Sequence, residues 1–389
     1  MENKKVFSKA NSTALKGVAI IMMVFHHCYS LPQRYAGRGI DFSPFGQHWV
    51  AMFSNSFKIC VSLYAFITGY GLYLSFKNMT KREKLTPRNI TKWTAARYIK
   101  TMSGFWLIVV LSYIICQLID GRTYRVFFFG TTITETASGL VRMATNFLGL
   151  GKLFGVNYFC GTWWYMSLAV LFILTAPLFV VLLDRFGSVA VLVLSFALPR
   201  IFKVPYEASS FVSFQCAFLF GMVFAKHNLL VRFANVKWLS GKAEKLNKPV
   251  KFVGMAALCF VLIYLYHCLM ASKFYEVRFA VIPTVIIIFC YEFLLDTIAI
   301  RKVLYFFGKH SMNIFLTHTF IRGIYLNDFI YSFGKWWEIP IVLFTLSLLL
   351  SVIIELFKKL IRFDRITTQM LSLTSKAIDR AYSKVKEQS

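Results

Sequence analysis

Ten runs of apolar residues, each near the length of a membrane-spanning helix, dominate this sequence. They lie near residues 14–31, 49–76, 99–119, 162–183, 186–201, 208–226, 251–271, 279–295, 311–330 and 339–360. A helix rises about 1.5 Å per residue, so about 20 apolar residues are needed to cross a bilayer. Soluble domains average about 45–50% apolar residues, whereas 57% of this chain is apolar and its mean hydropathy is +0.60. The sequence therefore predicts an all-α integral membrane protein, a bundle of about ten transmembrane helices.

The positive charge of the chain is concentrated in alternate loops. Lysine and arginine gather in 77–97, in 226–251 and after residue 357, and these segments share one side of the membrane with the N-terminus if there are ten spans. The long opposite loop, 120–161, carries few cations for its length. Because basic loops stay in the cytoplasm, both termini are predicted to be cytoplasmic. Topology and anionic lipid head groups thus account for most of the net charge of +27, and nucleic-acid binding is not predicted.

The chain divides into a transmembrane domain, residues 1–362, and a basic tail, residues 363–389. The tail has widely spaced apolar residues among lysines, a pattern typical of an amphipathic helix on the inner leaflet. The first apolar run resembles a signal peptide, but no small-residue cleavage site follows it, so we expect a retained first helix. The cysteines show no CxxC or other metal-ligand spacing, and no metal site is predicted.

The first apolar run carries ionisable side chains that are costly inside a membrane. Lys16 lies near its start, and His26 and His27 lie near its end. A step of eleven residues returns to within about 20° on a helix, so Lys16 and His27 share a face about 16 Å apart along the axis, while His26 points about 80° away. Ionisable groups in a span indicate function by default. The alternatives are that Lys16 snorkels to head groups and that the histidine bridges helices by hydrogen bonding.

Two further polar residues lie within predicted spans. Lys58 lies well inside the second run, where it either pairs with a carboxylate such as Asp41 or contacts a substrate. His318 shares a helix face with Ser311, seven residues earlier. It either supports catalysis or links two helices by a hydrogen bond. These alternatives stay open at the level of the sequence.

Five segments, in order, resemble motifs of the bacterial acyltransferase-3 membrane proteins. They are LKGVAIIMMVFHH at Leu15–His27, VSLYAFITGY at Val61–Tyr70, the basic pair of Arg97–Lys100, GTWWYMSLAVLFILTAPLF at Gly161–Phe179 and FGKHSMNIFLTHTF at Phe307–Phe320. Their order, their spacing over residues 15–320 and the ten expected spans agree with that family. Lys16 and Lys100 stand where the family usually has arginine, so neither can offer the bidentate contact of a guanidinium.

The resemblance implies transfer of an acyl group, most often acetyl, from cytoplasmic acyl-CoA to a hydroxyl of an envelope glycan or lipid-linked saccharide. It implies a multi-pass protein of the bacterial plasma membrane that contacts lipids and holds no tightly bound cofactor. The site residues it implies are His27 and His318 as catalytic, and Lys16, Arg97 and Lys100 for the CoA phosphates. From their own positions in or near the predicted spans, Lys58, Trp163 and Tyr165 are candidates for contact with the acceptor. Aromatic residues at the outer interface are also ordinary membrane anchors. The main alternative is a secondary transporter or lipid-glycan flippase, since such proteins also bury charges.

Overall fold

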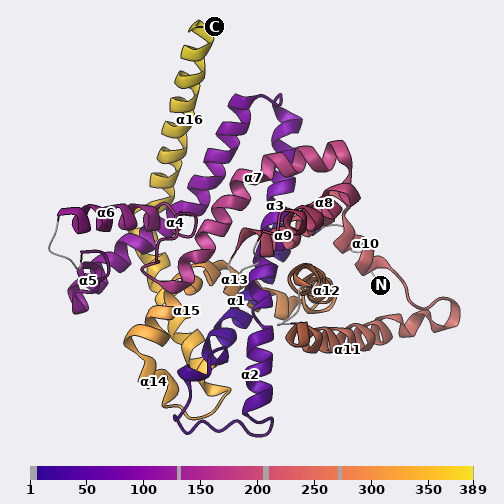
Figure 1. Cartoon of the computed structure of the whole chain (residues 1–389). Coiled ribbons are helices and arrows are strands. Elements are labelled where there is room, and N and C mark those ends of the chain that lie inside the picture. The colour runs from indigo at the N-terminus through magenta and orange to yellow at the C-terminus, as the bar shows by residue number, and fades with distance from the viewer. Residues whose placement is uncertain (1–6, 129–132, 205–209, 270–273, 389) are drawn as a thin grey trace. The chain divides into compact units, whose positions relative to one another are not determined.

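The computed structural model of the chain is all-helical and describes residues 7–128, 133–204, 210–269 and 274–388 (Figure 1). The longer helices are α1 (Lys9–Tyr29), α2 (Gln47–Ser56), α3 (Ile59–Arg82), α4 (Pro87–Asp120), α6 (Ile133–Phe147), α7 (Trp164–Phe186), α8 (Ser188–Ile201), α9 (Phe211–His227), α11 (Asn247–Cys268), α13 (Ile298–Thr319), α15 (Glu338–Leu360) and α16 (Phe363–Gln388). The short α-helices are α5 (Arg122–Phe128), α10 (Leu229–Asn235), α12 (Ile282–Phe289) and α14 (Asn327–Tyr331).

Other helical turns interrupt or join these helices. Three are 3-10 turns, η1 (Pro32–Arg34), η2 (Gly161–Trp163) and η3 (Gly241–Leu246). Three are π-helical turns, η5 (Val277–Val281), η6 (Cys290–Leu294) and η7 (Phe320–Tyr325). Within the described ranges the only β pairing is a single bridge between Asp41 and Lys335. The predicted all-α class is confirmed.

Six helical segments of the described ranges are long and apolar enough to cross a membrane: 47–82, 87–120, 161–186, 241–268, 277–294 and 338–360. A seventh is added if α9 and α10, which bend by 70° at their junction, form one broken span. The remaining predicted runs fall on α1, α8 and α13. Of these, α8 has only 14 residues, whereas α1 and α13 carry several polar side chains. The multi-pass helical architecture therefore holds, and the polar content of α1 and α13 points to the site.

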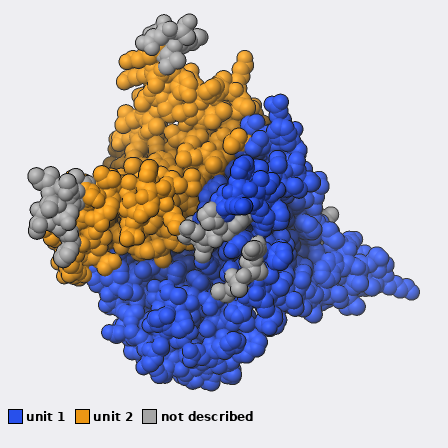
Figure 2. All heavy atoms as spheres, viewed as in Figure 1, with its two compact units in different colours: residues 1–74, 179–351 blue, residues 75–178, 352–389 orange. Residues whose placement is uncertain are grey.

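The helices form two compact units (Figure 2). The first unit comprises residues 1–74 and 179–351, and the second comprises residues 75–178 and 352–389. The chain passes from one unit to the other within α3, α7 and α15.

In the first unit, α1 packs along α13 at close range. A Cβ atom on Gly17 would collide with the carbonyl oxygen of Leu304, and one on Gly308 would collide with that of Thr13. Small residues let helix backbones approach closely in this way inside membranes. The number of residues between Gly17 and the end of α1 is similar to the number between Gly308 and the end of α13. The two helices therefore bring their C-terminal ends to the same level.

A buried ion pair also organises the first unit. Lys251 Nζ of α11 lies 2.6 Å from Glu292 Oε1 of η6, and both side chains are only 3% exposed. The same Nζ donates to the carbonyls of Phe233, at 2.9 Å, and Val236, at 3.0 Å, at the end of α10. An ammonium group is stable in a buried setting only when its donors are satisfied. Lys251 thus joins α10, α11 and η6.

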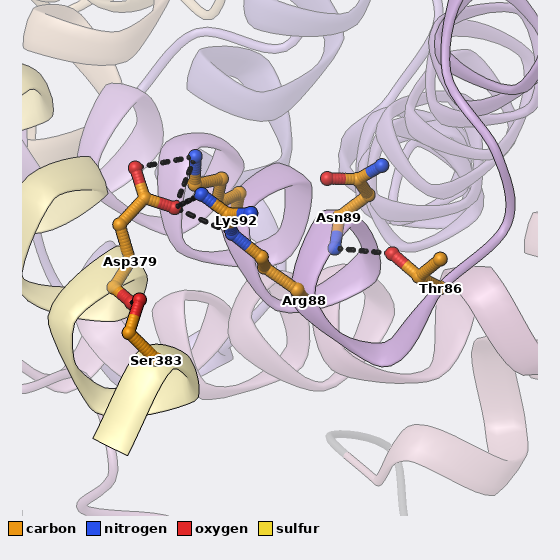
Figure 3. Close-up of polar contacts among 6 residues, drawn as sticks. All are labelled: Thr86, Arg88, Asn89, Lys92, Asp379 and Ser383. Carbon is orange, nitrogen blue, oxygen red and sulfur yellow. Dashed lines mark hydrogen bonds and ion pairs between the residues drawn. The ribbon is translucent and has the colours of Figure 1, made fainter. Parts of the chain in front are cut away.

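In the second unit, the C-terminal helix α16 packs against α4. Figure 3 shows the carboxylate of Asp379 on α16 facing two cations of α4. Lys92 Nζ donates to Asp379 Oδ2 at 2.7 Å, and Arg88 Nε donates to Oδ1 at 2.6 Å. A cavity of about 350 Å³ beside this contact is lined by Lys92, Trp93 and Leu371, among others. The basic tail is therefore a helix tethered to α4, and its predicted place on the inner leaflet stays a prediction.

The tether should be sensitive to pH. The hydrogen bonds from Lys92 and Arg88 lower the pKa of Asp379 from its ordinary value of 3.8. Because the pKa of the carboxyl is lowered on docking, the ion pair stabilises the docked helix at any pH above the pKa of the carboxyl in the unfolded chain. This stabilisation is lost as the pH falls through the pKa of the folded state. Asp379→Asn should remove the charge at neutral pH. We expect faster hydrogen–deuterium exchange of the amides in α16.

A matched control for this prediction lies on the same helix. Asp364→Asn removes an acid from the first turn of α16, where no ion pair forms within the described ranges. It should leave the exchange of the later turns unchanged. Equal exchange in Asp379→Asn and the unmodified protein would show that apolar packing alone docks α16.

Candidate active site

Three histidines of the first unit lie in contact at the ends of α1 and α13. The ring centroids of His27 and His318 are 4.8 Å apart, and those of His26 and His27 are 5.1 Å apart. His318 is fully buried, with 0% exposure, whereas His26 and His27 keep some accessible surface. The structure therefore brings together the two histidines that the sequence singled out.

Hydrogen bonding distinguishes His27 from its two neighbours. His26 Nδ1 lies 2.7 Å from the carbonyl oxygen of Ser54, and His318 Nδ1 lies 2.9 Å from that of Phe315. A carbonyl oxygen only accepts, so Nδ1 is the donor in both rings. His27 Nδ1 is buried without a hydrogen-bond partner in the described part of the chain. Of the three rings, only that of His27 is unconstrained by the backbone.

Arg34 lies against the C-terminal end of α1 and was missed by the sequence analysis. Its Nη1 donates to the carbonyl of His27 at 2.7 Å and to Ser30 Oγ at 2.8 Å. Burial and the nearby positive charge of Arg322 lower the pKa of Arg34 to about 10. Helical spacing could not have identified Arg34, because α1 ends at Tyr29. The position of Arg34 against the end of α1 depends on how the chain folds back after the helix.

Arg322 is a second buried cation that the sequence analysis missed. It lies in the π-helical turn η7 and is 6% exposed. It lies beside the hydroxyl of Tyr331, which donates to the carbonyl of Cys28 at 2.8 Å. Arg34 and Arg322 both act electrostatically on His27 and His318. The available signal was the four-residue step from His318, which places Arg322 on the same helix face.

Lys58 lies at the break between α2 and α3, not inside a continuous helix. Its charge acts on His26, so it belongs to the surroundings of the histidines. The carboxylate of Asp41 accepts hydrogen bonds from the backbone and hydroxyl of Ser43, at 2.8 and 2.9 Å. Among the described residues, Lys58 forms no ion pair with Asp41 or with another acid. Contact of Lys58 with a substrate stays a prediction.

The three cations predicted to hold CoA fall in both units. Lys16 lies on α1 of the first unit, is partly exposed, and forms no ion pair within the described ranges. Arg97 and Lys100 lie on α4 of the second unit. Arg97 donates to Ser75 Oγ, and its guanidinium lies 5.7 Å from the ring centroid of Trp93. Lys100 is exposed. Their common action on one ligand stays a prediction.

The two aromatic residues predicted to meet the acceptor differ in burial. Trp163 is 0% exposed and packs against Phe105, at 5.3 Å between ring centroids, and against Phe159, at 6.0 Å. It thus contributes to the core of the second unit. Tyr165 keeps accessible surface. Of the two, Tyr165 is the better placed to contact a ligand.

Comparison with known proteins identifies the family of the chain. Residues 10–356 match the acyltransferase 3 family, whose family model is described as an acyltransferase domain. No curated protein and no solved structure matches the chain. In the described ranges, no group of three or more His, Cys, Asp or Glu side chains is placed to hold a metal ion. The family match spans most of the chain and confirms the resemblance of the five motifs. The chain therefore belongs to the acyltransferase 3 family and is a multi-pass membrane acyltransferase.

Proposed function

We propose that this protein is an O-acyltransferase of the bacterial plasma membrane, with both termini in the cytoplasm. It moves an acyl group, most often acetyl, from cytoplasmic acyl-CoA to a hydroxyl of an envelope glycan or lipid-linked saccharide. The observation that carries the proposal is the state of His27. Its imidazole keeps accessible surface and its Nδ1 has no hydrogen-bond partner among the described residues, while His26 and His318 are held by backbone carbonyls.

In the proposed reaction His27 is the general base. Its neutral imidazole takes the proton of the acceptor hydroxyl while that oxygen attacks the carbonyl carbon of the thioester. The resulting tetrahedral intermediate expels the CoA thiolate, which takes the proton back from the imidazolium. The products are the O-acyl ester and CoA thiol, and no other reactant is needed. A positioned base of this kind accelerates a reaction by about 10²–10⁴-fold.

His318 supports this step from 4.8 Å away. Its Nδ1 proton is engaged by the carbonyls of Ile314 and Phe315, so its Nε2 carries the lone pair. Thr319 Oγ1 lies 3.3 Å from that Nε2. Like charges in contact disfavour each other, so only one of the two imidazoles becomes charged at a time. We assign the charge to His27 and a neutral, orienting role to His318.

The donor site is proposed to extend from Lys16 toward His27. Eleven residues of one regular helix separate them, about 16 Å along the axis. This distance leaves room for an extended pantetheine arm between phosphates at Lys16 and a thioester at the imidazole. Arg97 and Lys100 are proposed to contact donor phosphates as well, because lysine and arginine form strong charge-assisted hydrogen bonds with phosphate.

Removing one of these cations should weaken donor binding more than it slows the chemical step. A charge-assisted contact contributes about 1.5–3 kcal/mol, so KM for acyl-CoA should rise by about 10–150-fold in Lys16→Gln, Arg97→Gln or Lys100→Gln. The measurement is acyl-CoA affinity of the purified protein in nanodiscs.

The matched control is Lys16→Arg, which keeps the charge and restores the residue usual in the family. It should retain most activity. If Lys16 merely anchors α1 to head groups, Lys16→Gln should instead lower the folded yield with normal donor affinity. Unchanged affinity in all three glutamine variants would remove the proposed donor site.

The function as a whole is tested by release of free thiol. Purified protein in nanodiscs, given acetyl-CoA and an envelope-derived saccharide, should liberate CoA thiol and form an O-acetyl ester in equal amounts. A transporter or flippase would move the saccharide without releasing thiol. Absence of thiol release over a panel of envelope saccharides, from protein that binds acetyl-CoA, would contradict the proposal.

A further inference from the structure

The surroundings of the histidines in the first unit are basic and lack a compensating acid. The groups that act electrostatically on His26, His27 and His318 are the cations Arg34, Arg322 and Lys58 and the histidines themselves. Within the described ranges none of these three cations forms an ion pair. Buried cations without a partner are costly, and ionisable groups within a membrane indicate function by default. An anionic ligand would supply the missing charge.

Arg322 is the clearest member of this set. Its side chain is only 6% exposed, and its Nε has no hydrogen-bond partner in the described part of the chain. Its guanidinium lies beside the neutral hydroxyl of Tyr331. It lies in a π-helical turn, a local geometry that is frequent at functional sites. Among the described residues, no acid forms an ion pair with Arg322 to balance its charge.

Arg34 differs from Arg322, because its guanidinium already forms hydrogen bonds that stabilise the end of α1. Its Nη1 donates to the last turn of α1, at the carbonyl of His27. A cation at a helix C-terminus is stabilised by the carbonyls there. Its nearness to Arg322 is nevertheless unfavourable, since two guanidinium groups repel each other. An anion between them would relieve this repulsion.

The phosphates of acyl-CoA do not suit this position. In acyl-CoA the whole pantetheine arm separates the thioester from the phosphates. Arg34 bonds directly to the backbone of His27, and Arg322 reaches the next residue, Cys28, through Tyr331. With the thioester at His27, the donor phosphates therefore lie too far away to meet these arginines. The anion comes from the other substrate or from the reaction itself.

We propose that Arg34 and Arg322 form a binding site for a fixed negative charge on the acceptor, a carboxylate or phosphate close to the hydroxyl that is acylated. The acceptor is thus an acidic saccharide or a saccharide phosphate. Its assignment as acceptor rests on the proposed acyl transfer. The other source of anionic oxygen is the tetrahedral intermediate, which exists only during turnover. Cations that stay buried and unpaired in the resting protein favour a ligand that is charged before the reaction.

The first arm of the test measures binding without turnover. The purified full chain in nanodiscs is heated with methyl β-glucuronide, glucose 1-phosphate or the neutral methyl β-glucoside at equal ionic strength. The two anionic probes should raise the unfolding midpoint in a saturable way, and the neutral probe should not. In Arg322→Gln the shift should vanish. Equal shifts with charged and neutral probes in the unmodified protein would overturn the site, whether or not the variant folds.

Arg38→Gln is the matched control for this arm. Arg38 lies in the same connection as Arg34, but it pairs with Asp328 at 3.0 Å. The anion-dependent shift should persist in Arg38→Gln. Loss of the shift in both variants alike would show a general effect of basic charge and would overturn the site.

The second arm measures thiol release from acetyl-CoA with the same three acceptors. The charged acceptors should exceed methyl β-glucoside by about 10–150-fold in kcat/KM, the value of one charge-assisted contact. Arg322→Gln should raise KM for the charged acceptors with little change in kcat. If it lowers kcat equally for charged and neutral acceptors, Arg322 serves the tetrahedral intermediate and the proposal is wrong.

The two arms separate this inference from the proposed function. If anions raise the unfolding midpoint only when Arg322 is present, but no thiol is released, the anion site is supported and acyl transfer to these acceptors is contradicted. Thiol release that is as fast with the neutral acceptor as with the charged ones would keep acyl transfer and contradict the anion site.

Discussion

His27→Ala is expected to lower the rate of acyl transfer by about 10²–10⁴-fold, the contribution of a positioned general base. The imidazole of His27 is the one ring of the three that the backbone does not engage. Because the proposed donor phosphates lie about 16 Å away along α1, expression and acyl-CoA affinity should be largely retained. The measurement is the initial rate of thiol release, paired with the dissociation constant of acyl-CoA.

The adjacent histidine provides the control for this prediction. His26 points away from the Lys16–His27 face, and its Nδ1 donates to the carbonyl of Ser54. His26→Ala should therefore have a much milder effect on transfer. Loss of transfer in His26→Ala with activity retained in His27→Ala would refute the assignment of the base.

Lys251→Met is expected to destabilise the protein by about 3–5 kcal/mol, because it leaves Glu292 buried without its cation. The two side chains are each 3% exposed and lie 2.6 Å apart. The variant also removes the donor that holds the carbonyls at the end of α10. The measurement is the free energy of unfolding in mixed micelles, together with the folded yield.

A double variant separates the loss of the Lys251–Glu292 ion pair from the loss of the hydrogen bonds to the α10 carbonyls. Replacing a buried ion pair with apolar residues of similar volume is often neutral or stabilising. Lys251→Met combined with Glu292→Leu should therefore recover much of the stability that the single variant loses. If the double variant is as unstable as Lys251→Met, the bonds from Lys251 to the α10 carbonyls, and not the ion pair, hold these elements together.

The helical architecture was predictable because it depends on local composition. Within the described residues, each of the ten apolar runs is largely helical, since a backbone inside a bilayer must satisfy its hydrogen bonds within the segment. The continuity of helices was less predictable. The second run is broken at Lys58, and in the run at 279–295 the α-helix α12 lies between two π-helical turns. Such breaks depend on what packs against the helix, and composition carries no record of that.

The sequence by itself determined which residues of α1 share a face, because helical periodicity depends only on spacing. It therefore separated His27 from His26 and, through its motifs, indicated the family. Only the tertiary structure decided that His27 meets His318, because that contact follows from the close approach of α1 and α13 at Gly17 and Gly308. It also decided that Arg34 and Arg322 adjoin these rings. Contacts between residues about 290 positions apart depend on how the side chains of different helices pack against each other. The spacing of residues within one helix does not specify that packing.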